Sequence, residues 1–384
     1  TISRNLLIAL CATFISFCTL YTPQPMLPLL AAQFNISSSS AGLLMTATML
    51  PLGLAPIVYG YFLQAIPAKL MLTVALALLM LDQLAFYLAS EFWHLLLLRG
   101  VQGFLLPAIF TALMTYCASM VAAGQVRRVM GLYVAATILG GYLGRVIGGY
   151  FASEYTWQAA YLVMGFVLLI PIVLMRFAKA DAEISFARLD IRSISRVLSE
   201  RNYRLVFMAL AAIFFVYAGI LNLIPFRLYA LDPSISPFSI SNLYIGYLIG
   251  IPIALFSQSF SGYIGDERRS LMLGLGLNGI GLLAFFVSDI SILFVMLFCF
   301  AGGFFFIHST LSGLVNHMAL EHKGVVNGLY VSVYYLSGAL ASWFPGIVYD
   351  IYGWEMVMLL FIILLLVSGW IVSKLRLAPV PSTT

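Results

Sequence analysis

The sequence is poor in charged residues. Asp, Glu, Lys and Arg together make up only 9% of its 384 residues, whereas 62% are hydrophobic and the mean hydropathy is +1.04. A soluble globular domain carries roughly a quarter charged residues. A chain so depleted in charge is expected to lie in a lipid bilayer, where each charge inside a spanning segment has a structural or functional reason.

Patterns typical of enzymes, ATP-driven pumps and metal sites are also missing. The sequence contains no P-loop, HExxH or GxSxG motif, so we expect neither an enzyme nor a pump, and no cofactor. The cysteines form no CxxC pair and have no paired histidines nearby, so they predict neither a metal site nor a disulfide framework. All four lie in apolar stretches: Cys11, Cys18, Cys117 and Cys299.

Long apolar stretches predict an all-α membrane protein with twelve transmembrane helices. A spanning helix needs about 20 mostly apolar residues. Such stretches occur at 5–30, 41–62, 69–89, 94–116, 129–151, 157–176, 204–229, 241–263, 270–288, 292–315, 325–348 and 355–376. The first is too long for a cleaved signal peptide and is expected to be retained. A polar segment separates two six-helix bundles, which predicts an N-terminal bundle (1–176), a linker (177–203) and a C-terminal bundle (204–384).

The basic residues are distributed asymmetrically along the chain. Sixteen of the nineteen Lys and Arg residues fall in the N-terminal segment, the linker, alternate loops and the C-terminal segment. The remaining loops carry acids and no Lys or Arg. Under the positive-inside rule, this pattern predicts that both termini are cytoplasmic. The net charge of +5 is thus explained by orientation, and nucleic-acid binding is not expected.

The two halves of the chain resemble each other. Residues 130–157 ("MGLYVAATILGGYLGRVIGGYFASEYTW") align without a gap with 327–354 ("NGLYVSVYYLSGALASWFPGIVYDIYGW"). Two repeats of the same orientation are typical of secondary transporters, whose substrate site lies between the repeats near the middle of the membrane. We therefore expect a small-molecule substrate, alternating access, and a monomer surrounded by membrane lipid.

These features resemble the major facilitator superfamily over essentially the whole chain. "GYFLQAIPAK" (60–69) and "GYIGDERR" (262–269) resemble the family's charged loop motif, although Gln64 occupies the aspartate position of the first copy. The resemblance implies that these loops gate the cytoplasmic opening. The matching residues are Gly60, Lys69, Gly262, Asp266, Arg268 and Arg269.

Three further segments carry the resemblance. "LRGVQG" (98–103) resembles the family's helix-4 arginine motif, with Arg99 in place. "GYLGRVIGGY" (141–150) resembles the antiporter motif G-P-x-x-G-G, but Arg145 replaces the proline. With "YTPQPMLPLLAAQF" (21–34), these segments are most similar to drug and sugar-efflux facilitators of bacterial inner membranes. The resemblance implies the same location for this chain, and the missing proline leaves the direction of transport open.

Apart from charged residues at the ends of the predicted spans, three arginines and one acid remain within the membrane. Asp82 and Arg99 lie near the same ends of adjacent helices, so we expect an ion pair that is either fixed or proton-switched. Arg145 and Arg227 have no acid to pair with, and we expect the substrate to supply the counter-charge. The alternatives are a purely structural Arg145 bonded to backbone carbonyls, and an Arg227 that extends to the membrane interface.

The remaining candidates are glycines and polar residues around the expected cavity. Gly140, Gly144 and Gly148 recur every fourth residue, with Gly149 beside them, and predict close helix packing. Arg145 is turned about 100° from Gly144, toward the cavity. Further substrate contacts are expected from Tyr21, Gln24, Tyr217, Asn222, His308 and Ser342.

His308 is the only histidine deep in a predicted span. An imidazole titrates near neutral pH, so His308 is a candidate proton carrier, together with Asp82. The alternative is a neutral histidine that donates to a neighbouring carbonyl.

The function that these features favour is proton-coupled secondary transport of a small organic anion. Carboxylates, polycarboxylate chelators such as siderophores, and phosphorylated or sugar-acid solutes all fit. An anion is favoured because exporters of cations place acids in the cavity, whereas the surplus here is arginine. The alternatives are a broad-specificity drug/proton antiporter and a non-transporting membrane receptor.

Overall fold

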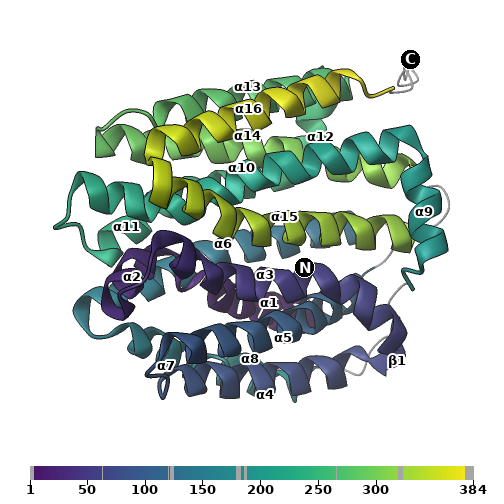
Figure 1. Cartoon of the computed structure of the whole chain (residues 1–384). Coiled ribbons are helices and arrows are strands. Elements are labelled where there is room, and N and C mark those ends of the chain that lie inside the picture. Colours follow the sequence, from purple (N-terminus) through teal and green to yellow (C-terminus); the bar gives the residue numbers. More distant parts are fainter. Residues whose placement is uncertain are drawn as a thin grey trace.

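The computed structural model describes residues 4–62, 64–119, 121, 125–178, 183–185, 188–264, 266–318 and 323–376. These form a bundle of long helices that run roughly side by side (Figure 1). In Figure 1 the first half of the chain, in purple and blue, lies below the second half, in green and yellow. The linker helix lies at one end of the bundle. We call this the linker end, and the opposite end the far end.

The first half begins with a bent unit. Pro23 has no backbone N–H, so α1 ends at Tyr21 and the chain continues through a short 3₁₀ turn into α2. The elements in chain order are α1 (Arg4–Tyr21), η1 (Gln24–Met26), α2 (Leu27–Phe34), α3 (Ser38–Phe62), β1 (Gln64–Pro67), α4 (Ala68–Phe86), α5 (Phe92–Ser119), α6 (Val126–Glu154), α7 (Trp157–Val167) and α8 (Leu169–Met175).

The linker contributes strand β2 (Glu183–Ser185), which pairs antiparallel with β1, and helix α9 (Ile191–Ser199). Asp190 caps α9 by accepting a hydrogen bond of 2.6 Å from the Ser193 N–H, and this bond lowers the pKa of the exposed Asp190 carboxyl. The small sheet was not predicted from the sequence.

The second half has the same order of long helices. Its eighth predicted span contains a 3₁₀ segment between two α-helices. The elements are α10 (Arg201–Leu231), α11 (Pro237–Leu243), η3 (Tyr244–Ile249), α12 (Gly250–Ile264), α13 (Glu267–Ala284), α14 (Ile290–Met318), α15 (Lys323–Tyr352) and α16 (Trp354–Ser373).

The all-α membrane fold is confirmed, with one difference in the number of spans. Among the described residues, eleven helical units are long and apolar enough to cross a membrane, against twelve expected. The span predicted at 270–288 is α13, which has 18 residues and begins with three charged residues, Glu267, Arg268 and Arg269. Because of these charges, α13 contains no apolar stretch long enough to count as a spanning segment. It nevertheless packs against α14 and α16 as a spanning helix would.

Helices α6 and α1 pack through the predicted glycine stripe. A methyl group added to these glycines would lie 2.1–2.3 Å from carbonyl oxygens of α1 or of Thr22 just after it, which is far inside van der Waals contact. The pairs are Gly140 with Phe14, Gly144 with Cys18, and Gly148 with Thr22. Both helices contribute every fourth residue, so the two backbones run in direct contact along one seam.

Gly144→Ala is therefore expected to destabilise the protein by about 1–3 kcal/mol, because the added methyl group forces the α1 and α6 backbones apart. The matched control is Gly276→Ala in α13, since no atom lies within 4 Å of the methyl group that it adds. The control should be neutral or slightly stabilising. Thermal unfolding of detergent-purified protein, followed by tryptophan fluorescence, measures both. Equal melting temperatures for the two variants would contradict the tight seam.

Two equivalent helix caps join the halves at the far end. Asp350, near the end of α15, accepts hydrogen bonds from Ser38 N (3.1 Å), Ser39 N (3.0 Å) and Ser39 Oγ (2.6 Å) at the start of α3. Ser153, near the end of α6, accepts one of 2.9 Å from Phe238 N at the start of α11. Residues 153 and 350 correspond in the internal repeat. The far end is thus closed by the same contact made twice, once with a charged acceptor and once with a neutral one.

Candidate functional site

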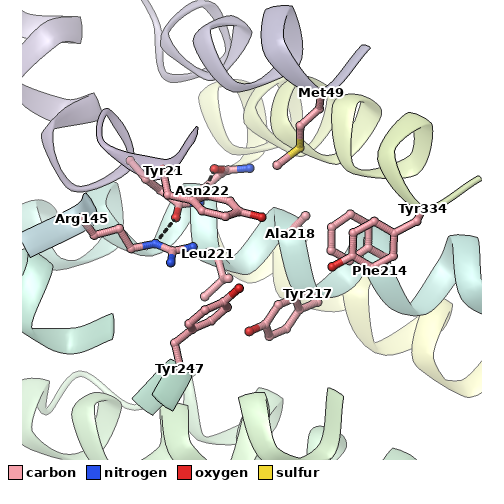
Figure 2. A pocket seen from close by; sticks show the side chains of 11 residues that line it. Tyr21, Met49, Arg145, Phe214, Tyr217, Ala218, Leu221, Asn222, Tyr247 and Tyr334 are labelled. Carbon is pink, nitrogen blue, oxygen red and sulfur yellow. Dashed lines mark hydrogen bonds between the residues drawn. The ribbon is translucent and has the colours of Figure 1, made fainter. Parts of the chain in front are cut away.

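A small cavity lies between the two halves, part-way along the bundle (Figure 2). Its free volume of about 10 Å³ is room for about one water molecule. The lining is mainly aromatic, and Arg145 is the one charged residue among the described residues that form it. The lining residues are Tyr21, Gln24, Met49, Arg145, Phe214, Tyr217, Ala218, Leu221, Asn222, Tyr247 and Tyr334.

Arg145 projects from α6 into this cavity and is 0% exposed. Its Nε donates to Gln24 Oε1 (2.6 Å), and its Nη1 donates to the carbonyl of Gly141 one turn earlier (2.9 Å). Its Nη2 has no hydrogen-bond partner. In the part of the chain that the structure describes, no carboxylate lies within salt-bridge distance of the guanidinium. A full positive charge is thus buried without a counter-ion, which is costly unless something else compensates it.

Three tyrosine rings partly compensate this charge. The Arg145 Cζ lies 4.2 Å from the ring centroid of Tyr21 and 4.7 Å from those of Tyr244 and Tyr247. A desolvated cation over an aromatic face gains roughly 2 kcal/mol. The rings stabilise the cation without neutralising it, so the site keeps a net positive charge.

A directed chain of hydrogen bonds runs from Arg145 across to the other half. Gln24 Nε2 donates to Asn222 Oδ1 (2.5 Å), and Asn222 Nδ2 donates to Ser342 Oγ (2.7 Å). Ser342 donates in turn to the Gly338 carbonyl (2.7 Å). Arg145 can only donate hydrogen bonds, so the atom of Gln24 that it contacts must be the amide oxygen. This fixes the orientation of the Gln24 amide and, through the next hydrogen bond, that of the Asn222 amide. The repeat-equivalent residues Arg145 and Ser342 are thus connected through one polar residue from each half.

Tyr217 on α10 supplies a second unpartnered polar atom at the cavity. The residue is 2% exposed, and its hydroxyl has no hydrogen-bond partner. Its ring stacks on Phe304, with the centroids 3.7 Å apart. In Figure 2 the side chains of Tyr21, Tyr217, Tyr247 and Arg145 converge on the cavity. The structure therefore brings together six predicted contacts: Tyr21, Gln24, Arg145, Tyr217, Asn222 and Ser342.

Arg227, a predicted substrate contact, is not among the residues that line this cavity. Helix α10 continues through Pro225 to Leu231 and carries Arg227 to the far end. There its Nη2 donates to Ser288 Oγ (3.4 Å) in the α13–α14 loop, and its Cζ lies 5.6 Å from the Trp354 ring centroid. These contacts match the alternative of an arginine at the membrane interface.

His308 also lies outside the cavity lining. Its Nδ1 is 2.9 Å from the hydroxyl of Tyr330, and its ring stacks on Phe304 with the centroids 5.7 Å apart. Phe304 in turn stacks on Tyr217. The histidine is therefore behind the cavity wall, one aromatic ring away from a residue that lines it.

The predicted ion pair between Asp82 and Arg99 is not formed in this structure. Arg99 is 0% exposed and donates to backbone carbonyls of Leu44 (3.0 Å), Thr19 (3.3 Å) and Leu20 (2.9 Å). It also donates to Gln102 Oε1 (2.6 Å). The physical reason is the set of free backbone carbonyls at the end of α1. These carbonyls have lost helical partners at the proline break, and a cation stabilises such a C-terminus. Arg99 is thus a helix cap.

Asp82 is buried beside this cap. Its Oδ2 accepts from the side chain of its neighbour Gln83 (3.2 Å), and its Oδ1 has no partner. Tyr161 on α7 has an unpartnered buried hydroxyl as well, and its ring stacks on Phe86, one turn after Asp82. These groups form a buried polar cluster within the first half, separate from the cavity.

The predicted gating residues tie each charged loop to the last helix of its own half. Lys69 Nζ donates to the Ala178 carbonyl (2.6 Å) just after α8, and Arg268 donates to the Leu375 carbonyl just after α16. Asp266 caps α13 by accepting from Arg268 N (3.0 Å), and the exposed Arg269 lies 3.9 Å from it. Gly60 and Gly262 lie in the linker-end turns of α3 and α12.

Two functional residues were missed from the sequence, Tyr244 and Tyr247. They lie three residues apart in η3, and residues spaced by three eclipse each other on a 3₁₀ helix. Both rings therefore face the same way, toward Arg145. On a regular α-helix the two side chains would be about 60° apart and thus less closely aligned. The sequence signal is only a pair of tyrosines in an apolar run.

Comparison with known proteins places the chain in a family. The model of the Major Facilitator Superfamily matches residues 9–342 and 206–384. The inner membrane transport protein YnfM of Escherichia coli is 27% identical over 352 residues, covering 88% of this chain and 82% of that protein. The multidrug efflux protein YfmO of Bacillus subtilis is 23% identical over 338 residues, covering 87% and 84%.

The fold matches that of solved transporters. A bacterial homologue of the human lysosomal transporter Spinster, in an inward-facing and occupied conformation, superimposes with a TM-score of 0.74 at 12% identity, covering 98% of both chains. The family consists of transporters rather than enzymes. With its two helical halves and the cavity between them, the chain is a multi-pass secondary transporter and belongs to the Major Facilitator Superfamily.

Proposed function

We propose that the chain carries small organic anions across a bacterial inner membrane by alternating access, as a monomer. The observation that carries the proposal is the fully buried guanidinium of Arg145, whose Nη2 is unpartnered and which has no carboxylate beside it among the described residues. A buried charge of this kind is strongly stabilised when a mobile anion pairs with it. The position between the halves is where carriers of this architecture bind their substrates.

The proposed membrane arrangement follows from the charge pattern. Residues 1–176 and 204–384 form the moving bundles, joined by a cytoplasmic linker at 177–203, and α13 is the twelfth span. The linker end then faces the cytoplasm, and the far end faces the outside. The caps made by Asp350 and Ser153 are hydrogen bonds that water can replace, so the far end can open when the halves tilt. The loop contacts of Lys69 and Arg268 hold each half rigid during that motion.

Drug efflux is the second candidate, and the likeness to a multidrug efflux protein favours it. A cation exporter needs an acid in the cavity to attract its substrate. The described lining residues supply an arginine and several tyrosines instead, and no carboxylate. The charge of the cavity therefore favours the anion.

Counterflow in proteoliposomes tests the proposal directly. Benzenesulfonate and benzyltrimethylammonium have the same aromatic body and permanent charges of opposite sign, so neither leaks through lipid as a neutral acid or base. We expect saturable counterflow of benzenesulfonate and none of benzyltrimethylammonium. Counterflow of the cation alone would overturn the proposal in favour of drug efflux. Absence of counterflow for both probes would also count against it.

Proton coupling is a further part of the proposal, with Asp82, His308 and the substrate itself as carriers. If protons bind His308, uphill transport of the anion depends on pH through the imidazole of this residue. His308→Gln keeps a hydrogen-bond partner for Tyr330 but removes the titration. It should flatten the pH profile of uphill transport while preserving downhill exchange. An unchanged profile would leave Asp82 or a co-transported acid as the carrier.

A further inference from the structure

We infer that the substrate is a monovalent anion with a flat, apolar body, bound through its charge to Arg145 and through a second acceptor atom to Tyr217. This inference rests on the proposed function and narrows it. Carboxylates, chelators and sugar acids could all pair with a single buried arginine, and the inference narrows this range of substrates.

The first argument is the number of cations at the cavity. Arg145 is the one charged residue in the described lining. Arg99 is already used by three backbone carbonyls and Gln102, and Arg227 lies at the far end. A dianion would bring one negative charge with no partner into a low-dielectric space, and a buried uncompensated charge is strongly destabilising. One cation therefore matches one negative charge.

The second argument is the number of free donors on Arg145. Nε is occupied by Gln24, and Nη1 has one bond to Gly141. Nη2 keeps both of its N–H groups and is the nitrogen that an incoming anion can reach without breaking an existing bond. A single oxyanion group fits this reduced set of donors.

The third argument is the nature of the walls. Phe214, Tyr217 and Tyr334 line the side opposite Arg145 and stack on one another or on Phe304. The ring faces of this wall offer dispersion and stacking, and among these three residues only the two tyrosine hydroxyls can form hydrogen bonds. A polyhydroxylated solute would lose its hydration there without replacement, whereas an aromatic body loses nothing.

The fourth argument is the orphaned hydroxyl of Tyr217. It is a buried donor and acceptor on the second half of the chain, and Arg145 is on the first. A substrate that reaches both atoms connects the two halves directly. Because the cavity of about 10 Å³ has room for about one water molecule, the two halves must move apart to admit this substrate, which then contacts both of them.

Four probes test the substrate class by ligand-dependent thermal stabilisation of the purified full chain. Benzenesulfonate has one charge and an aromatic body. Benzene-1,3-disulfonate adds a second charge, methanesulfonate lacks the ring, and benzenesulfonamide lacks the charge. We expect benzenesulfonate to bind at least about tenfold more tightly than each of the others, in line with about 1.4 kcal/mol per tenfold.

Two tyrosine variants test the second contact. Tyr217→Phe removes the hydroxyl that would donate to a second sulfonate oxygen, and it should weaken benzenesulfonate binding at least threefold. Tyr161→Phe is the matched control, because Tyr161 also has a buried unpartnered hydroxyl but lies in the core of the first half. The control should bind benzenesulfonate like the parent protein. Equal effects of the two substitutions would overturn the role of Tyr217.

The outcomes separate this inference from the proposed function. If the disulfonate binds as tightly as benzenesulfonate or more tightly, and Arg145→Gln abolishes both, the carrier still takes anions but the monovalent class is wrong. The same holds if methanesulfonate binds as well as benzenesulfonate. If benzenesulfonamide binds equally well, or no anion binds, both the inference and the anion carrier are overturned.

Discussion

Arg145→Gln is expected to lower benzenesulfonate counterflow by about 100-fold at limiting substrate. A hydrogen-bonded charge pair in a desolvated site contributes about 2–5 kcal/mol, which covers a factor of this size. Glutamine can still bond to Gln24, so the chain to Asn222 and Ser342 survives and the amount of folded protein should not fall. Counterflow at matched protein density in the vesicles is the measurement.

Two further arginine variants make this result specific. Arg145→Lys keeps the charge but has a single donor group, which cannot serve Gln24, Gly141 and the substrate together, so transport should be intermediate. Arg227→Gln is the control, because it removes a different arginine that lies at the far end, and this variant should transport normally. Normal transport by Arg145→Gln, or an equal loss in Arg227→Gln, would contradict the assignment.

Arg99→Met is expected to destabilise the protein by about 3–5 kcal/mol, the largest stability effect that we predict. The substitution fills the space but leaves the carbonyls of Thr19 and Leu20, at the end of α1, without a donor in a buried region. Each unsatisfied group of this kind contributes about 1–3 kcal/mol of destabilisation. A large fall in melting temperature or in folded yield is the expected readout.

Asp82→Asn is the control for this helix cap. Because Asp82 and Arg99 form no salt bridge in the described structure, the substitution should change the melting temperature little, and Arg99→Lys with Asp82→Asn should give nearly additive losses. If the double variant loses clearly less stability than the two single variants added together, Asp82 and Arg99 interact as an ion pair, and the cap assignment is contradicted.

The sequence was sufficient for features that depend on composition and periodicity. Apolar runs located the spans, and the gapless repeat anticipated that Arg145 and Ser342 would occupy equivalent places on the two sides of one site. The four-residue spacing of Gly140, Gly144 and Gly148 anticipated the seam with α1. Each of these signals is carried by side-chain type and spacing alone.

Other features could not be predicted from the sequence, because they depend on contacts with backbone atoms or on the local geometry of a helix. Arg99 pairs with carbonyls that a proline break leaves free, and a carbonyl has no signature in the sequence. Arg227 was expected near the outer end of its helix, and the sequence did not decide between a substrate contact and a place at the membrane interface; α10 stays regular through Pro225 and carries it to the far end. Tyr244 and Tyr247 are aligned toward Arg145 by the 3₁₀ segment η3, which apolar composition does not distinguish from an α-helix.

The central claim is that the charge of Arg145 is met by the charge of the substrate, and the position of a bound anion tests it most directly. A structure of the full chain with 4-iodobenzenesulfonate locates both ends of the ligand, because iodine scatters strongly. We predict a sulfonate oxygen at about 2.8–3.0 Å from Arg145 Nη2 and the iodinated ring between Phe214, Tyr217 and Tyr334. A sulfonate bound beside Arg227 or at the linker end, with Arg145 Nη2 still unpartnered, would contradict the account.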